Sequence, residues 1–268
     1  MLEALSYEFI QNALIAGLLV SLASGIIGSL IVVNRMVFLA GGIAHTAYGG
    51  IGLAVFFGFP IFLGASLFAV VAALIIAFIT FHHRNRMDTF IGLMWAIGMA
   101  LGVVLIDLTP GYNVDLMSYL FGSILAVSRE DLYYMGGLLI STILIMTFWY
   151  RDILAVSYDS EYATLRGINV KFFYTLILIL SALTVVVAIK VVGLILVIAL
   201  LTIPVYIAEK LSTTLYMMMI LSGIFSSIFT LIGLGFSYNF DIASGASIIL
   251  VSAFSLFLFL FINRLRLL

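Results

Sequence analysis

Apolar runs of about twenty residues follow one another along the chain, separated by short polar connectors. A run of this length forms a helix that can cross the hydrocarbon core of a bilayer. Hydrophobic residues make up 65% of the chain and charged residues only 9%, whereas a soluble domain carries about 25% charged residues. Too few polar side chains remain to cover a surface in water, so the sequence predicts an all-α integral membrane protein.

Nine of these runs are predicted to be transmembrane helices within a single transmembrane domain, 1–268. Between the fourth and fifth runs, the apolar stretch 115–127 is too short to cross and is expected to form a re-entrant or interfacial helix. Only Lys190 and Gly193 interrupt the apolar block 172–208, and the division between two helices is placed there. The nine predicted spans are 8–33, 36–58, 60–81, 89–108, 132–150, 172–190, 192–208, 213–235 and 243–263.

The distribution of basic residues predicts the orientation, because cytoplasmic loops are enriched in Lys and Arg. With nine spans and a cytoplasmic C-terminus, the N-terminus lies outside and only Arg129 and Lys190 face the outside. The opposite orientation would invert this ratio. The basic residues expected on the cytoplasmic side are Arg35, Arg84, Arg86, Arg151, Arg166, Lys171, Lys210, Arg264 and Arg266.

The one long connector, 151–171, is polar and falls on the predicted cytoplasmic side. A short amphipathic helix is expected within it at about 159–166, because Gly167 supplies a signal for the C-terminus of a helix. The connector is either a solvated link or a contact for a cytoplasmic partner, and its residues alone leave both interpretations open.

His45 lies in the glycine-rich span 36–58, and every other histidine belongs to the basic loop 82–86. It follows Arg35 by ten residues, so on a helix it lies roughly 15 Å deep, near the middle of the bilayer. A titratable side chain at that depth is costly and often functional. His45 is therefore a candidate ligand for a transition metal or carrier of a proton; a packed, hydrogen-bonded imidazole is the alternative.

Acidic residues are scarce, and most mark predicted membrane boundaries. Asp107 and Asp115 flank the external loop 108–114, and Asp241 opens the last span from the outer side. A carboxylate near an outer mouth attracts cations and can share a metal ion with an imidazole. Each of these residues is thus either a cation-attracting group or a marker of the water interface.

Several enzyme signatures are missing from the chain. It contains no Walker A sequence for ATP phosphates, no HExxH zinc-protease motif and no cysteine. The paired intramembrane carboxylates of ion-coupled pumps are also lacking. A transport function would therefore draw its energy from another chain, or from a gradient acting on few groups. A membrane enzyme is disfavoured, and neither a tightly bound cofactor nor a nucleic-acid partner is expected.

Six segments form a set that extends over nearly the whole chain. The most distinctive is Val114–Leu132, with a Tyr-Leu-Phe-Gly core followed by Asp131 and Leu132. The others are Gly28–Gly50, Asp88–Gly102, Ser157–Val170, Val192–Ala208 and Asp241–Leu250. In this order they resemble the membrane permease subunits of bacterial and archaeal zinc/manganese ABC importers.

This resemblance implies a type II, vitamin B12 importer-like ABC permease fold in the plasma (inner) membrane of a prokaryote. It implies a homodimer with the translocation path at its two-fold axis. It also implies two further partners, a cytoplasmic subunit that binds ATP and an extracytoplasmic metal-binding protein. A coupling helix would contact the ATP-binding subunit, and the residues matched to it are Asp159, Glu161, Arg166 and Gly167.

The resemblance also matches His45 to a gating histidine of the family. The acidic residue that commonly lies four positions earlier is replaced here by Gly41, so the usual pair on one helix face is missing. Asp115, in the matching external segment, is then the candidate second metal ligand. The expected cargo is a divalent transition metal, zinc or manganese, with iron as a further candidate.

Two other functions stay open on the sequence alone. A secondary metal transporter or proton-coupled transporter that works by itself would need no partner at 151–171. An ABC permease for a metal chelate, such as a siderophore or cobalamin, would share the architecture and differ in its cargo.

Overall fold

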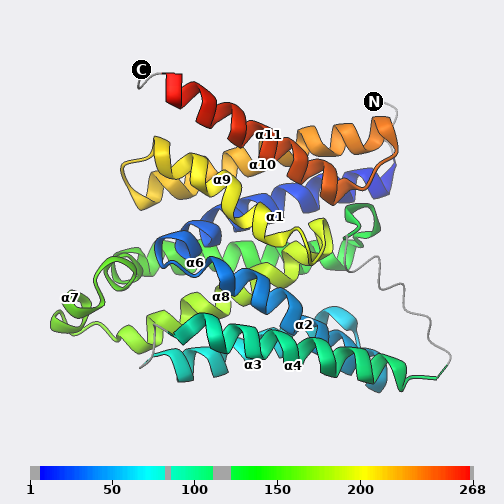
Figure 1. Ribbon diagram of the computed structural model, residues 1–268, viewed down its shortest axis with the longest axis horizontal. Helices are drawn as coiled ribbons and strands as arrows, with labels where there is room; N and C mark the ends of the chain where they lie inside the picture. The colour runs from blue at the N-terminus through cyan, green and yellow to red at the C-terminus, as the bar shows by residue number, and fades with distance from the viewer. Residues whose placement is uncertain (1–6, 82–85, 111–121, 266–268) are drawn as a thin grey trace. The chain divides into compact units, whose positions relative to one another are not determined.

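The computed structural model describes residues 7–81, 86–110 and 122–265, and within these ranges it consists of helices and connectors without a β-strand (Figure 1). Eight of the described helices are long and apolar enough to cross a membrane. These are α1 (Glu8–Val33), α2 (Val37–Phe57), α3 (Ile61–Thr80), α4 (Met87–Asp107), α6 (Arg129–Tyr158), α8 (Val170–Val192), α10 (Leu215–Phe240) and α11 (Ser244–Leu265). The shorter elements are the 3₁₀ turn η3 (Ile124–Ala126), α7 (Ser160–Leu165) and α9 (Val197–Leu211).

A helix lies at each of the nine predicted spans, but the seventh is shorter than predicted. α9 has 15 residues, fewer than the roughly 20 that cross the hydrocarbon core. The reason lies at Gly193, which adopts a φ of 87°, a left-handed conformation that glycine tolerates and that ends α8. The described part of the chain therefore has eight helices of spanning length, where nine were predicted.

Two other predicted boundaries differ from the structure. The fifth span, predicted at 132–150, continues to Tyr158 with a local break at Trp149 (φ −115°, ψ 21°), so the polar connector is shorter than predicted. Most of the interfacial helix predicted at 115–127 lies outside the described residues, and its described end forms only the turn η3.

The helices group into two compact units, each assembled from separate stretches of chain. Unit 1 comprises 1–32, 117–141 and 187–268, and unit 2 comprises 33–116 and 142–186. Boundaries between the units fall inside α6 and α8 and before the last residue of α1, so these three helices contribute residues to both units. The single domain predicted for 1–268 stays a prediction.

In unit 2, α2 packs along both α3 and α4. Glycines bring the backbones of α2 and α4 into direct contact: a Cβ added to Gly98 would lie 2.6 Å from Thr46 Cα, and one added to Gly102 would lie 2.5 Å from Tyr48 O. Small residues permit such close approach in lipid, where helices associate through packing. The helix that carries His45 is therefore held against α4 by its backbone.

In unit 1, α1 and α10 meet along a seam of small and hydroxyl-bearing residues. A Cβ on Gly25 would collide with the backbone of Gly223. Ser21 Oγ and Thr230 Oγ1 are hydrogen-bonded at 2.8 Å, and Ser222 Oγ donates to the carbonyl oxygen of Gly25 at 2.8 Å. These bonds satisfy buried hydroxyls that have no access to water.

A partly buried ion pair in unit 1 joins the end of α8 to the start of α6. Lys190 Nζ lies 3.2 Å from Asp131 Oδ2. The same carboxylate oxygen accepts hydrogen bonds from the backbone N–H and the hydroxyl of Ser128, both at 2.9 Å. The carboxylate of Asp131 thus compensates the positive charge of Lys190, whose side chain is partly buried. The pairing lowers the free-energy cost of removing that charge from water.

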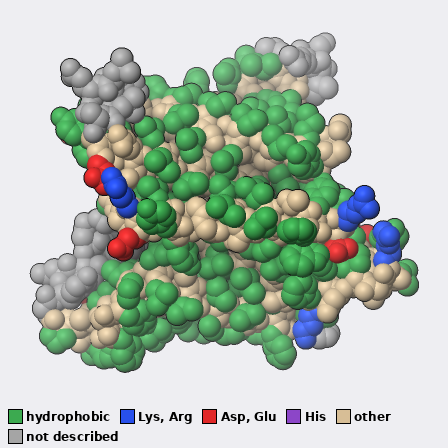
Figure 2. Space-filling model, turned by 180° about the vertical axis from the view of Figure 1, so that it is seen from behind, with side chains coloured by type: hydrophobic (Ala, Val, Ile, Leu, Met, Phe, Trp, Pro, Cys, Tyr) green, Lys and Arg blue, Asp and Glu red, His purple; other side chains and the backbone are tan. Residues whose placement is uncertain are grey.

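Hydrophobic side chains cover most of the face seen in Figure 2. Some of the largest side chains of the chain are strongly exposed, including Phe78 at 74%, Phe148 at 75% and Phe254 at 71%. A surface of this kind is unfavourable in water and suited to hydrocarbon. Together with the eight apolar helices, it confirms a multi-pass membrane protein.

The close contact between α2 and α4 predicts opposite effects for two substitutions on α4. Gly98→Ala places a Cβ against the backbone at Thr46, whereas a Cβ on Gly92 meets nothing within 4 Å. We expect Gly98→Ala to destabilise the protein by about 1–3 kcal/mol through overpacking. Gly92→Ala should be neutral or stabilising by up to about 1 kcal/mol, because alanine favours the helix.

Thermal unfolding of the purified variants in one detergent measures this difference. The melting temperature of Gly98→Ala should fall well below that of Gly92→Ala, and equal melting temperatures would contradict the backbone contact.

Candidate functional site

His45 projects from the centre of α2 and is half-buried, between the fully buried residues Ala44 and Thr46. Its imidazole stacks on the indole of Trp95 from α4, with the ring centroids 3.9 Å apart and the planes 9° from parallel. Its Nδ1 atom is buried and has no hydrogen-bond partner in the described part of the chain. The alternative, a histidine that is held in the core by a hydrogen bond at Nδ1, is therefore not supported.

A complete metal site is not formed around His45 by the described residues. No group of three or more His, Asp or Glu side chains able to hold a metal ion occurs among them. The predicted second ligand, Asp115, lies outside the described residues. What the structure places at this site is a single imidazole beside an indole, and the pairing of His45 with Asp115 stays a prediction.

The second candidate region is α7, which lies between α6 and α8 as the sequence predicts. Asp159 caps its N-terminus: Oδ1 accepts hydrogen bonds from the backbone N–H of Glu161 at 3.1 Å and of Tyr162 at 2.9 Å. An aspartate at this position satisfies backbone donors that otherwise have no partner within the helix. The side chain predicted to contact a partner is thus also the residue that begins the helix.

The C-terminal end of α7 closes at Gly167, whose φ is 75°. The N–H of Gly167 donates to Thr164 O at 2.9 Å, and the N–H of Ile168 donates to Ala163 O at 3.0 Å. The guanidinium of Arg166 lies over the Tyr162 ring at 5.8 Å, an arrangement that favours a cation. The structure therefore brings Asp159, Glu161, Arg166 and Gly167 together on one short helix.

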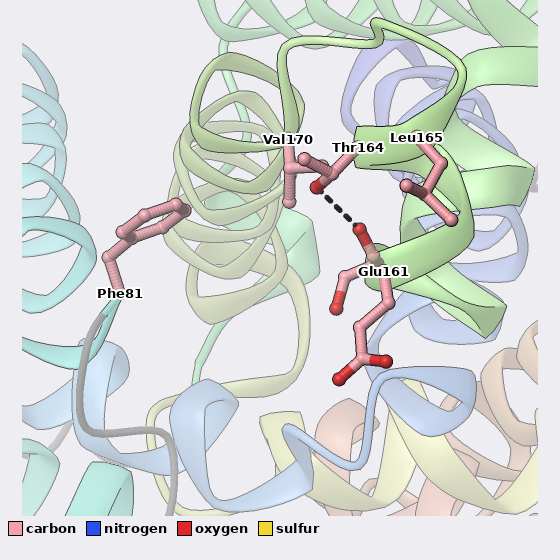
Figure 3. Close-up of a pocket in the computed structure, with 6 residues that line it drawn as sticks. Phe81, Glu161, Thr164, Leu165 and Val170 are labelled. Carbon is pink, nitrogen blue, oxygen red and sulfur yellow. Dashed lines mark hydrogen bonds between the residues drawn. The ribbon is translucent and has the colours of Figure 1, made fainter.

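A cavity of about 430 Å³ opens beside α7. Figure 3 shows Phe81 on one side of it, with Glu161, Thr164 and Leu165 of α7 on the other. The Thr164 hydroxyl donates to Ser160 O at 2.8 Å and stays on its own helix. Leu165 is 87% exposed, so α7 offers an apolar side chain as well as a carboxylate to anything that approaches it.

A second cavity, of about 630 Å³, lies where α1 leads into α2 and α4 begins. Arg35 holds a left-handed φ of 58° in this connection. Asn34 Nδ2 donates to Ser157 Oγ of α6 at 3.0 Å, which ties the connection to the helix that leads into α7. Asp88, Tyr158 and Tyr174 complete the polar part of the lining.

Sequence reasoning missed two features of these regions. Trp95 was not singled out, although it is one of only two tryptophans in the chain and sits on the neighbouring glycine-rich helix. Leu165 and Tyr162 were also missed as exposed apolar side chains of α7. Large apolar residues in a short polar connector are the signal that would have found them.

Comparison with known proteins places the chain in one family along nearly its whole length. The family model for the ABC 3 transport family matches residues 6–263. An uncharacterized membrane protein of Synechocystis is 48% identical over 264 residues, which cover 98% of this chain and 94% of that protein. The manganese transport system membrane protein MntC of Halalkalibacterium halodurans is 37% identical over 251 residues, covering 94% and 86% respectively.

Solved structures with the same fold support this placement. PsaBC from Streptococcus pneumoniae, in complex with Fab, has a TM-score of 0.86 at 32% identity, covering 96% of this chain and 93% of that chain. An inward-facing putative metal-chelate type ABC transporter has a TM-score of 0.71 at 16% identity, covering 94% and 85%. The second likeness shows the fold alone. Together these neighbours confirm the predicted ABC permease fold.

The cap at Asp159 predicts a local effect on α7. Asp159→Ala removes the oxygen that accepts from two backbone N–H groups and should destabilise α7 by about 0.5–2 kcal/mol. Asp159→Asn keeps a capping oxygen and should leave the helix intact. Hydrogen–deuterium exchange over 159–168 should be faster in Asp159→Ala and unchanged in Asp159→Asn. Equal exchange in both variants would show that the cap does not stabilise α7.

Proposed function

Because the chain belongs to the ABC 3 transport family, we propose that it is the membrane permease subunit of an ATP-driven importer of a divalent transition metal. The observation that carries this proposal is the polar connector folded as a capped, exposed helix, α7. The chain has no Walker A sequence of its own, so ATP would be bound by a partner. An exposed helix at the end of two apolar helices gives that partner a point of contact.

Zinc or manganese is the proposed cargo. Relatives named for manganese transport include MntC and the ScaB permease of Streptococcus parasanguinis, which is 32% identical over 92% of this chain. Imidazole suits zinc, and carboxylate suits manganese. His45 and Asp115 would together offer one ligand of each kind. A sparse site of this sort binds weakly enough to release the ion, as transport requires.

Coupling to ATP hydrolysis is proposed to run through α7 into α6 and α8. Only Asp159 separates α6 from α7, and its N–H donates to Ala155 O in the last turn of α6 at 2.9 Å. Two residues after Gly167, Asn169 Oδ1 accepts from the N–H of Phe172 at 3.0 Å and caps α8. A displacement of α7 by a closing ATP-binding subunit would thus reach both helices through short hydrogen-bonded joints.

The assembly we propose contains two copies of this chain, two ATP-binding subunits and an extracytoplasmic metal-binding protein. The permease would lie in the plasma membrane of a prokaryote, with its N-terminus outside and its C-terminus in the cytoplasm, an arrangement in which the short helix α9 makes a ninth crossing. The excess of Lys and Arg in the connectors on the α7 side supports this orientation. Metal would pass by alternating access at the dimer axis, with His45 as a transient contact.

His45→Phe tests the metal contact. The variant keeps an aromatic ring against Trp95 and removes both ring nitrogens. We expect metal uptake to fall by about tenfold or more, because groups that merely orient a ligand already contribute about 10–100-fold. Thr46→Ser, the matched control on the next residue, keeps the hydroxyl that donates to Gly42 O and should transport normally. Normal metal uptake by His45→Phe at normal expression would show that His45 is not a metal contact.

The double substitution Asp159→Ala with Arg166→Ala tests the dependence on an ATP-binding partner. An ABC permease should lose metal-stimulated ATPase activity of the reconstituted complex, because the contact helix loses its cap and its exposed cation. A secondary transporter that works alone would keep its uptake rate. Unchanged metal uptake by the double variant without any ATP-binding subunit, with α7 shown to be disordered by hydrogen exchange, would favour that alternative.

A further inference from the structure

The imidazole of His45 and the indole of Trp95 lie face to face. Their centroids are 3.9 Å apart and their planes differ by 9°. Trp95 supplies the one ring contact of His45 found among the described residues. Stacking of this kind favours one orientation of the imidazole, because a rotation about χ2 would move the two faces out of contact.

The usual means of orienting a metal-binding histidine is missing at His45. Such a histidine almost always donates the N–H of its other ring nitrogen to an acceptor, which fixes the ring and its tautomer. Nδ1 of His45 is buried and has no such partner in the described part of the chain. A metal ion bound at Nε2 would therefore meet a ring that no described hydrogen bond holds in place.

We propose that Trp95 is a positioning residue for His45, and that its stacked indole takes over the orienting role that a hydrogen bond to Nδ1 performs elsewhere. This inference rests on the proposed function of His45 as a metal contact. The lone pair of Nε2 lies in the plane of the imidazole, so fixing that plane fixes the direction from which a metal ion can bind. The indole also covers one face of the ring.

The backbone contact between α2 and α4 sets the spacing of the two rings. Thr46 follows His45 on α2, and Gly98 lies three residues after Trp95 on α4, within one helical turn. A Cβ on Gly98 would lie 2.6 Å from Thr46 Cα, so the helices touch beside the ring pair. The stacking distance is thereby determined by rigid elements and not by the side chains alone.

The first test compares substitutions at Trp95 by metal-stimulated ATPase activity of the complete importer. Trp95→Leu should raise the Zn²⁺ or Mn²⁺ concentration for half-maximal stimulation roughly 3- to 10-fold, the worth of one stacked pair. The maximal rate should stay within about twofold of wild type. Trp95→Phe retains a stacked ring and should restore the wild-type concentration. A merely structural role would instead lower the maximal rate and the melting temperature.

Phe38→Leu is the matched control. Phe38 also touches the Trp95 ring, at 6.1 Å and 37°, but makes no contact of this kind with His45. Its removal should leave the metal concentration for half-maximal stimulation unchanged. An effect of Phe38→Leu as large as that of Trp95→Leu would overturn the specific role of the stack.

A second measurement reads the stack directly. The chain has two tryptophans, so Trp149→Phe leaves Trp95 as the sole indole of the purified permease. Titration with ZnCl₂ in nanodiscs should change its emission, and the added substitution His45→Phe should abolish that change. If Zn²⁺ does not change the tryptophan emission of the Trp149→Phe protein, the inference is overturned. This measurement does not require the Trp95→Leu variant to be active.

The two sets of variants separate failure of the inference from failure of the proposed function. Full activity of His45→Phe would reject the metal contact itself. Loss of activity in His45→Phe, together with a wild-type metal response in Trp95→Leu, would reject only the role of Trp95.

Discussion

The backbone contact between α2 and α4 is the constraint on which the candidate metal contact depends. Lipid offers no hydrophobic driving force for two helices to associate, so close packing must hold them together. Gly98 and Gly102 let α4 approach until its backbone meets Thr46 and Tyr48. A half-buried imidazole can keep a fixed orientation inside an apolar bundle only if the walls around it are rigid. The glycines provide that rigidity by removing the side chains that would otherwise hold the helices apart.

The region around α7 is stabilised in a different way, by hydrogen bonds that are local in the chain. Asp159 caps one end, Gly167 closes the other, and Asn169 starts the next helix. The connection from α6 through α7 to α8 is short and hydrogen-bonded. A movement of α7 would therefore be transmitted to both helices and would not be absorbed by a flexible loop. A side chain such as Leu165, fully presented at the surface, adds contact area without taking part in the fold.

Local sequence patterns made most of the helices predictable, whereas the contacts between helices could not be predicted from such patterns. Hydropathy located the spans, and the glycine signal at Gly167 located α7. The short length of α9 depends on the left-handed conformation of Gly193, which composition does not reveal. His45 stood out as a lone imidazole, but its partner Trp95 comes from another helix, and no periodicity connects the two. The other predicted ligand falls outside the described residues.

The break in α6 at Trp149 has a consequence for where α7 stands. The turns after it, 151–158, are not a straight extension of the span. Ile153 and Val156 are buried, and Ser157 Oγ accepts a hydrogen bond from Asn34 in the connection between α1 and α2. These turns therefore pack against the ends of neighbouring helices, and α7 begins directly after them. A soluble partner that bound α7 would come to rest close to those helix ends, at the surface of the bilayer.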